Sequence, residues 1–288
     1  MHLPNKSSFP SYLGMGADDI AYMTMSKKSS AAQAMQFDHL VIFVEDLDGA
    51  INDFSALGFN VTRGGSHGLT ENALIIFANQ SYIELLALKP FYANPLMAIA
   101  NRLGILQWQS ERKKSLYCRL LRWVNGDVGP VDWCVRVTNL AASLERWKEG
   151  GLDILNSETF ARERTDGEIV RWHLGGVKNH NLPILLQDIT ALDQRVPLVD
   201  AMHANQGAEL REVQFAVEDT GVACDMANRF LGVESGADNP LMVGDVKISF
   251  AEQSVQCKLC LSIVYPGKQV KQLDIASSYG LSIKLVPA

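Results

Sequence analysis

The stretch Phe37-Asp-His-Leu-Val-Ile-Phe-Val44 opens the part of the sequence that decides the fold. Its apolar run has the length of a buried β-strand. The acidic pair Glu45-Asp46 follows, and then a helical pattern over residues 47–57 that Gly58 closes. Acidic residues favour the start of a helix, and glycine favours its end. The sequence therefore predicts a strand followed by a helix.

The same pattern returns three times along the chain. The second copy has a strand over 131–137, a helix over 140–148 and Gly150. The third has a strand over 210–217, a helix to 231 and Gly232. The fourth has a strand over 258–265, a helix from about Lys268, Gly280 and a last strand over 281–286. In the first three copies further strands follow, at 72–77 and 82–88, at 169–174 and 182–187, and at 241–243 and 245–250. The repeating unit is therefore βαβββ.

A βαβββ unit exposes an apolar sheet face, so it must pair with a second copy to bury that face. Four copies make two pairs, and we expect an α+β fold of paired mixed sheets in which the second pair is truncated. The predicted organisation is a flexible N-terminal extension over 1–35, a first paired domain over 36–195 and a partial second domain over 203–288. A short docking arm is the alternative interpretation of residues 1–35.

Composition narrows the class of partner. The 288 residues hold 32 acidic and 26 basic side chains, for a net charge of -6. This balance argues against nucleic acid or an anionic membrane surface as the partner. No apolar run approaches the roughly 20 residues that cross a bilayer. Five cysteines, an odd number, and no secretory signal pattern predict a cytoplasmic protein without a disulfide scaffold.

One charged residue stands out within the predicted strands. Glu84 is the only charge in the run Tyr82–Leu88, and burial of an unpaired carboxylate costs several kcal/mol. His39 and Glu84 lie on strands that we expect to be neighbours, so together they could offer nitrogen and oxygen ligands to Zn, Fe, Mn or Ni. The alternative is a carboxylate that is hydrogen-bonded to the wall of a cup, beside a core histidine.

Several motifs together resemble the vicinal oxygen chelate (glyoxalase/bleomycin-resistance/extradiol dioxygenase) superfamily and, over residues 37–190, its glyoxalase-like family. They are Phe37-Asp-His39, Gly64-Gly-Ser-His67 with Thr70-Glu-Asn72, Tyr82-Ile-Glu84-Leu, Asp166-Gly167 with Arg171-Trp172, Leu182-Pro183 running to Gln187, and Met202-His203 running to Gly207. The resemblance implies that two βαβββ units form a cup around the site. It also implies that first-strand and last-strand residues of each unit hold a divalent ion that binds vicinal oxygens of a substrate.

The second unit departs from that ligand pattern. Trp133 falls where His39 sits in the repeat, and Gln187 falls roughly where Glu84 sits. Tryptophan cannot bind a metal and an amide binds one poorly, so the set is short of the usual three protein ligands. His67 could complete a set of His39, His67 and Glu84, or it could act as an acid or base, the alternative being a solvated loop histidine.

Weaker candidates surround these residues. Thr70 and Asn72 could hydrogen-bond substrate oxygens or satisfy a turn, and Gln187 could also contact the substrate. Trp133 could stack on a ligand or pack as a core aromatic residue. In the third copy the positions that match His39 and Glu84 are Glu212 and Ser249, so we expect that cup to be structural.

Three functional hypotheses follow from this pattern. The first is an enzyme of lyase, isomerase or dioxygenase type, in which Glu84 and His67 are catalytic and a divalent metal or an acid–base pair acts in the cup of the first domain. The second is a metal-free protein that binds a drug or a metabolite. The third is a structural or assembly role. In each of the first two the partner is a small molecule, and a homodimer is among the assemblies that we consider.

Overall fold

The computed structural model describes residues 35–89, 108, 114–125, 128–164, 166–179, 181–231, 240–252, 258–274 and 278–288. The extension expected over residues 1–35 lies outside the described residues, except for its last member. Met35 is buried and opens the first strand, where it pairs with Val137.

Two βαβββ units follow one another in the first part of the chain, as the repeat predicts. The first unit is β1 (Met35–Phe43), α2 (Leu47–Ala56), β2 (Thr62–His67), β3 (Thr70–Ile76) and β4 (Tyr82–Leu88). The second is β5 (Gly129–Val137), α6 (Leu140–Glu149), β6 (Ile154–Glu163), β7 (Ile169–Val177) and β8 (Ile184–Asp188). Side chains of Asp46 and Asn139 cap α2 and α6 by accepting from the N–H groups of Asp48 and Ala142. A further helix, α5 (Tyr117–Asn125), precedes the second unit and was not expected.

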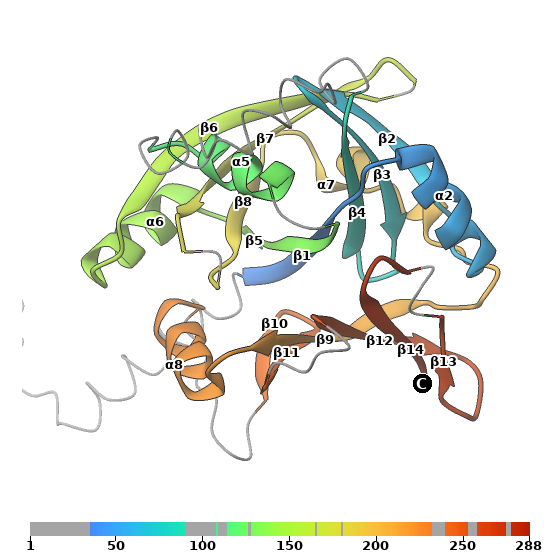
Figure 1. Ribbon diagram of the computed structural model, residues 1–288. Coiled ribbons are helices and arrows are strands. Elements are labelled where there is room, and N and C mark those ends of the chain that lie inside the picture. The colour runs from blue at the N-terminus through green and yellow to red at the C-terminus, as the bar shows by residue number, and fades with distance from the viewer. Residues whose placement is uncertain are drawn as a thin grey trace, which may run out of the picture.

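The two units close into a single barrel with the strand order β1-β4-β3-β2-β6-β7-β8-β5 (Figure 1). The closing contact pairs Ser66 of β2 with Glu163 of β6. Gly65 makes this approach feasible, because its φ is +120° and a Cβ there would collide with the carbonyl oxygen of Glu163. The expected cup is thus confirmed, with its edges joined.

The third and fourth copies form a separate six-stranded sheet with the order β10-β11-β9-β12-β14-β13. Its elements are β9 (Glu209–Val217), α8 (Thr220–Leu231), β10 (Leu241–Val243), β11 (Val246–Glu252), β12 (Leu259–Tyr265), β13 (Lys271–Gln272) and β14 (Leu281–Pro287). The helix predicted from Lys268 is wrong. Lys271 and Gln272 instead pair with the free edge of β14, whose backbone groups would otherwise lack partners.

The second sheet packs beneath the barrel, against the outer face of β1 and β5 (Figure 1). Phe37 and Trp133 stack with ring centroids 6.3 Å apart, and Trp133 meets Phe215 of β9 at 5.0 Å. Trp147 of α6 donates from Nε1 to the carbonyl of Phe230 in α8 over 2.7 Å. One continuous apolar core therefore holds the two sheets together.

Between β8 and β9 the chain forms α7 (Leu192–Arg195) and a 3-10 turn, η1 (Leu198–Asp200), and then passes His203. His203 is buried, and its Nδ1 accepts a hydrogen bond of 3.0 Å from the backbone N–H of Asn60. Its ring contacts Phe59 and Phe77 edge-on. Burial lowers the pKa of His203, so the fold favours the neutral ring.

We expect this histidine to make stability depend on pH. A lowered pKa in the fold means that His203 contributes fully above its unfolded pKa, about 6.5, and that this contribution falls as pH drops below that value. The urea midpoint should fall from pH 7.5 to pH 5.5, and the fall should be smaller in His203→Asn, which keeps an acceptor for Asn60. An equal fall in both proteins would contradict this expectation.

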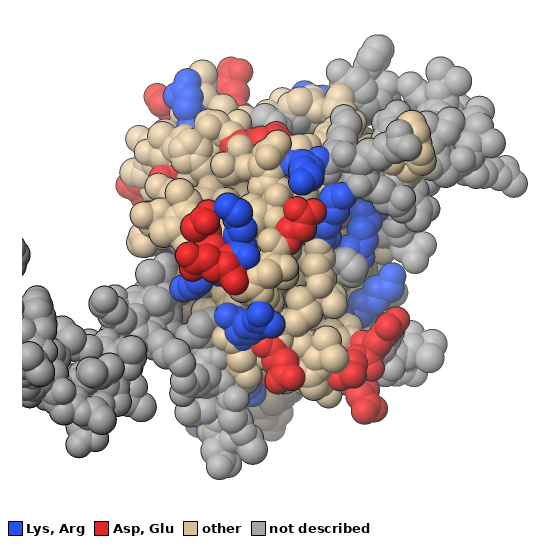
Figure 2. All heavy atoms as spheres, turned by 90° about the vertical axis from the view of Figure 1, so that its left-hand side faces the viewer, with Lys and Arg blue, Asp and Glu red and all other residues tan. Residues whose placement is uncertain are grey.

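Charges of both signs are interspersed on the face formed around α6 and α8 (Figure 2). No helix of the described part of the chain is long and apolar enough to cross a membrane. The expectation that nucleic acid is not a partner agrees with this mixed surface and stays a prediction.

Candidate active site

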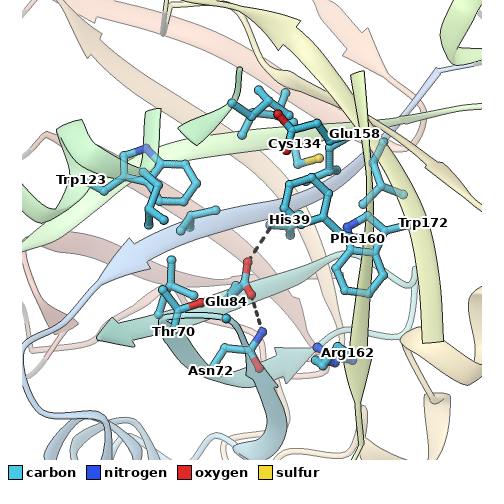
Figure 3. Close-up of a pocket in the computed structure, with 18 of the residues that line it drawn as sticks. His39, Thr70, Asn72, Glu84, Trp123, Cys134, Glu158, Phe160, Arg162 and Trp172 are labelled. Atoms are coloured by element: carbon cyan, nitrogen blue, oxygen red, sulfur yellow. Dashed lines mark hydrogen bonds and ion pairs between the residues drawn. The ribbon is translucent and has the colours of Figure 1, made fainter. Parts of the chain in front are cut away.

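A cavity of about 360 Å³ lies inside the barrel, between its inner face and α5. Its lining polar side chains include His39, Thr70, Asn72, Glu84, Glu158 and Arg162 (Figure 3). Its aromatic side chains are Tyr82, Tyr117, Trp123, Phe160 and Trp172. A largely apolar cavity with a few convergent polar groups is the usual form of a small-molecule site.

A bulge in β1 builds the polar end of this cavity. Phe37 pairs with Val135 of β5, but His39 pairs with Cys134, so Asp38 is one extra residue between them. A bulge of this kind re-aims side chains relative to the strict alternation of a strand. Phe37 consequently belongs to the outer core while His39 lines the cavity, and Asp38 can reach the ring of His39.

Asp38 is fully buried and collects three basic partners. Arg195 of α7 binds it with both terminal nitrogens, at 3.0 Å and 2.7 Å, and Arg136 donates to it at 3.2 Å. Nδ1 of His39 lies 2.8 Å from Oδ1. Burial alone would raise the pKa of Asp38, but the charge of Arg195 and the hydrogen bonds from His39 and Arg195 outweigh it and hold that pKa well below its usual range. Asp38 is therefore a carboxylate that orients the imidazole.

His39 and Glu84 meet inside the cavity. Nε2 of His39 lies 3.4 Å from Oε2 of Glu84, and the histidine ring stacks on Tyr82 with centroids 4.6 Å apart. The amide of Asn72 donates a short hydrogen bond to Oε1 of Glu84 (Figure 3). The result is a chain from Asp38 through His39 to Glu84, whose inner end is open to a ligand.

Most of the predicted site residues converge here. His39, Thr70, Asn72 and Glu84 all line the cavity. The backbone of His67 ends β2, where it pairs with Thr70, but its side chain is not among those the structure describes. Its role as ligand or acid–base group therefore stays a prediction.

Two predicted residues lie elsewhere. Trp133 points to the outer core, because the bulge shifts the pairing by one residue and places Cys134 opposite His39. Gln187 accepts from the N–H of Leu140 at 2.7 Å and so caps α6, while Leu186 lines the cavity at the corresponding place. Trp133 therefore has the core position that was its alternative interpretation, and neither residue lines the cavity, so a substrate contact by either of them stays a prediction.

Sequence reasoning missed three residues of the site. Asp38 was quoted only as part of a motif, and Arg195 lies far away in sequence with no local pattern to mark it. Arg162 lines the cavity on β6 together with Glu158 and Phe160. The even spacing of these three residues was the available signal, because alternate residues of a strand share one face.

Helix α5 covers part of the cavity and is anchored by a second buried ion pair. Arg119 donates to both oxygens of Asp132, at 2.7 Å and 2.6 Å, and also to the carbonyls of Val177 and Leu182. Trp123 donates from Nε1 to the same aspartate at 3.0 Å. This network fixes the aromatic side of α5 over the cavity.

The second sheet repeats part of this geometry at the positions that the repeat identifies. Ser249 donates to Glu212 at 2.8 Å, and Lys247 pairs with Glu212 at 3.0 Å. The carboxylate is thus neutralised by its own sheet, which agrees with the expected structural role of that half.

The described residues do not fit a catalytic metal centre. His39 and Glu84 are two suitable donors at a suitable separation, but a catalytic site usually has three protein ligands. At the facing positions of the second unit stand Cys134, whose pKa is raised well above the usual value by burial, and Leu186. No group of three or more His, Cys, Asp or Glu side chains placed to hold a metal occurs among the described residues.

A closed pair of βαβββ units with a polar cluster inside is the arrangement that the resemblance to the vicinal oxygen chelate superfamily implies. The chain belongs to the family of the glyoxalase-like domain, whose model matches residues 37–229. The resemblance of the motifs to this family is confirmed.

The comparison with solved structures supports the fold through a match with a TM-score above 0.5. A hypothetical protein from Staphylococcus aureus is 16% identical, with a TM-score of 0.66 over 88% of this chain and 100% of that chain. The Mn(II)-bound glyoxalase from Novosphingobium aromaticivorans (7% identity, TM-score 0.45, 88% and 81% covered) and the homoprotocatechuate 2,3-dioxygenase from Arthrobacter globiformis (12%, 0.43, 82% and 65%) are more distant. The comparison with curated proteins gave no match.

Proposed function

We propose that this protein is a small-molecule enzyme of isomerase or lyase type, which moves a proton at a carbon next to a carbonyl group. The observation that carries the proposal is the chain Asp38–His39–Glu84 at the end of an aromatic cavity. A carboxylate that faces an oriented imidazole in a largely apolar site is suited to acid–base catalysis.

Asp38, His39 and Glu84 each have a distinct role. Asp38 accepts from Nδ1 of His39 and so directs Nε2 toward Glu84. Glu84, held by Asn72, takes the proton from the carbon, and His39 stabilises the acid or carries the proton onward. We propose that Thr70 and Asn72, which line the same cavity, contact substrate oxygens. General acid–base catalysis of this kind contributes roughly 10²–10⁴-fold to rate.

The test is deuterium exchange in D₂O, followed by proton NMR, on a panel of pyruvate, 2-oxobutanoate, phenylpyruvate and neutral methyl ketones. We expect the protein to accelerate exchange of the hydrogens next to the carbonyl in at least one compound. The double variant His39→Asn/Glu84→Gln is the blank. Exchange no faster than this blank for every compound would contradict the proposal.

A divalent ion held by His39 and Glu84 is the alternative chemistry within the same cavity. Because the described donors are two, we expect purified protein to hold clearly less than one Zn, Fe, Mn or Ni per chain, unchanged in His39→Ala and Glu84→Ala. Elemental analysis by mass spectrometry measures this. One equivalent of metal that both variants lose would instead favour the chelate mechanism, with His67 as the natural third ligand.

Binding without chemistry is a second candidate, and the aromatic lining favours it. Tyr117, Trp123, Phe160 and Trp172 surround the cavity, and stacking on such rings suits a flat apolar ligand. A ligand that binds in this cavity while no compound exchanges its hydrogens would support this function over catalysis.

A further inference from the structure

Arg162 is a buried cation inside the cavity. It lies on β6, is 5% exposed, and points into the same space as Glu84 and Asn72 (Figure 3). Burial lowers its pKa, and the negative charge of Glu84 acts in the opposite direction. A guanidinium nevertheless stays protonated at neutral pH.

The described residues around it supply no direct ion pair, only the longer-range charge of Glu84. Nη2 donates to the carbonyl of Arg195 at 3.2 Å, and Nε has no hydrogen-bond partner among the described residues. The other two arginines that are buried in the described part of the chain each form an ion pair with a carboxylate: Arg195 with Asp38, and Arg119 with Asp132. No such ion pair is formed by Arg162 within the described part of the chain. A buried charge without a partner is costly, so its retention requires a compensating partner.

The neighbourhood of Arg162 leaves room for a ligand group. A Cβ on Gly64 would lie 2.9 Å from Nη1 of Arg162 and would collide with Oδ1 of Asn72, so the glycine lets both side chains reach this corner. Oδ1 of Asn72 is a second buried polar atom without a hydrogen bond among the described residues. Two unsatisfied groups of opposite polarity thus meet beside the acid–base pair.

We propose that Arg162 is the anion-binding residue of the cavity, and that the ligand is a small carboxylate with an apolar or aromatic body. The carboxylate pairs with the guanidinium at the Gly64 corner, while the body lies against Phe160 and Trp172. This inference names the substrate class for the proposed function and rests on that function only for the chemistry that follows binding. Arginine suits the role because its planar fork matches the two oxygens of a carboxylate.

Removal of the Arg162 charge should leave the melting temperature of the protein unchanged or raise it. Without a ligand Arg162 is an uncompensated buried charge, so Arg162→Met should melt at the same temperature as the original protein or a higher one. Arg195→Met, which removes the buried arginine that pairs with Asp38, should melt at a lower temperature. A purely structural arginine would behave like Arg195 in this comparison.

The test measures binding of 3-phenylpropanoate and of its neutral amide, 3-phenylpropanamide, through the fluorescence of Trp123 and Trp172, which line the cavity. We expect the carboxylate to bind roughly tenfold or more tightly than the amide. In Arg162→Met the two should bind within about threefold, and Arg162→Lys should keep part of the preference. The matched control is Arg164→Met, whose arginine pairs with Asp166 at 2.8 Å near the surface, and it should keep the full preference.

Three results would overturn the proposal: equal binding of the two compounds by the original protein, no binding of either at millimolar concentration, or a carboxylate preference that survives in Arg162→Met. The same titration in His39→Asn/Glu84→Gln separates the two proposals. A carboxylate preference retained in this variant, together with exchange in the original protein no faster than in the variant, supports the anion site and contradicts the acid–base function. Exchange by the original protein without any carboxylate preference supports the acid–base function and contradicts the anion site.

Discussion

Replacing Asp38 with Asn should lower the free energy of unfolding by about 3–5 kcal/mol, because it breaks a buried ion pair from one side. Asp38 is 0% exposed, and Arg195, Arg136 and His39 all direct hydrogen bonds or charge at it. Loss of its charge leaves Arg195 buried with Asp188 as its one remaining acidic partner among the described residues. For a domain whose total stability is roughly 5–15 kcal/mol, this is a large fraction.

Asp188→Asn is the matched control for this experiment. Asp188 binds the same arginine at 2.6 Å, but its side chain is 15% exposed, so water can replace part of the interaction. Urea unfolding of both variants, with Arg195→Met and the double variant Asp38→Asn/Arg195→Met, gives a mutant cycle. We expect the double variant to lose much less than the sum of its two parts. A loss in Asp38→Asn no larger than that in Asp188→Asn would show that Asp38 is not the central anion.

The sequence allowed the repeat and the inner face of the regular strands to be predicted. His39 and Glu84 were expected on neighbouring strands, and both line the cavity. The match of Trp133 to His39 in the repeat does not hold, because the extra residue at Asp38 places Cys134 opposite His39, and Trp133 packs in the core as its alternative interpretation had it. A bulge depends on the packing of both strands, and no composition signal in either strand marks it.

The two buried arginines of the cavity could not be predicted for a different reason. Arg195 reaches Asp38 only because α7 folds back over the barrel, and Arg162 enters the site only because β6 joins β2 at the closing contact. Both placements are tertiary and join residues far apart in the chain. Sequence periodicity reports local structure: it indicates that Glu158, Phe160 and Arg162 share one face of a strand, but not that this face lines the site, and it gives no signal for Arg195.

The repeat also shows how one unit came to hold the site. Each unit carries an aspartate in the same motif position, Asp38 in Phe37-Asp-His39 and Asp132 in Val131-Asp-Trp133, and each aspartate binds a buried arginine. In the first unit a histidine follows and faces the cavity. In the second unit a tryptophan follows and faces the core, and the aspartate instead anchors α5. An aspartate–arginine ion pair thus orients His39 in the first unit and anchors helix α5 over the cavity in the second.

Glu84→Gln should reduce exchange of the best compound of the panel by roughly 10²–10⁴-fold while its binding changes by no more than about threefold. The amide fills the same space and can still accept from Asn72, but it cannot take a proton. Glu158→Gln is the matched control, because Glu158 lines the same cavity and the substitution makes the same change in charge. Glu158→Gln should lower exchange by less than about tenfold. The contacts that hold Glu84 come from His39 and Asn72, and Glu158 is part of neither.

A second comparison tests whether Glu84 and His39 act as one unit. If the proton moves between Nε2 of His39 and the carboxylate that lies 3.4 Å away, removal of either group disables the same step. His39→Asn, Glu84→Gln and the double variant should then lose similar amounts of activity, because the effects of residues that act together are far from additive. Losses that multiply in the double variant, or an equal loss in Glu158→Gln, would mean that the carboxylate acts through the general charge of the cavity. Proton transfer through the pair explains only the non-additive result.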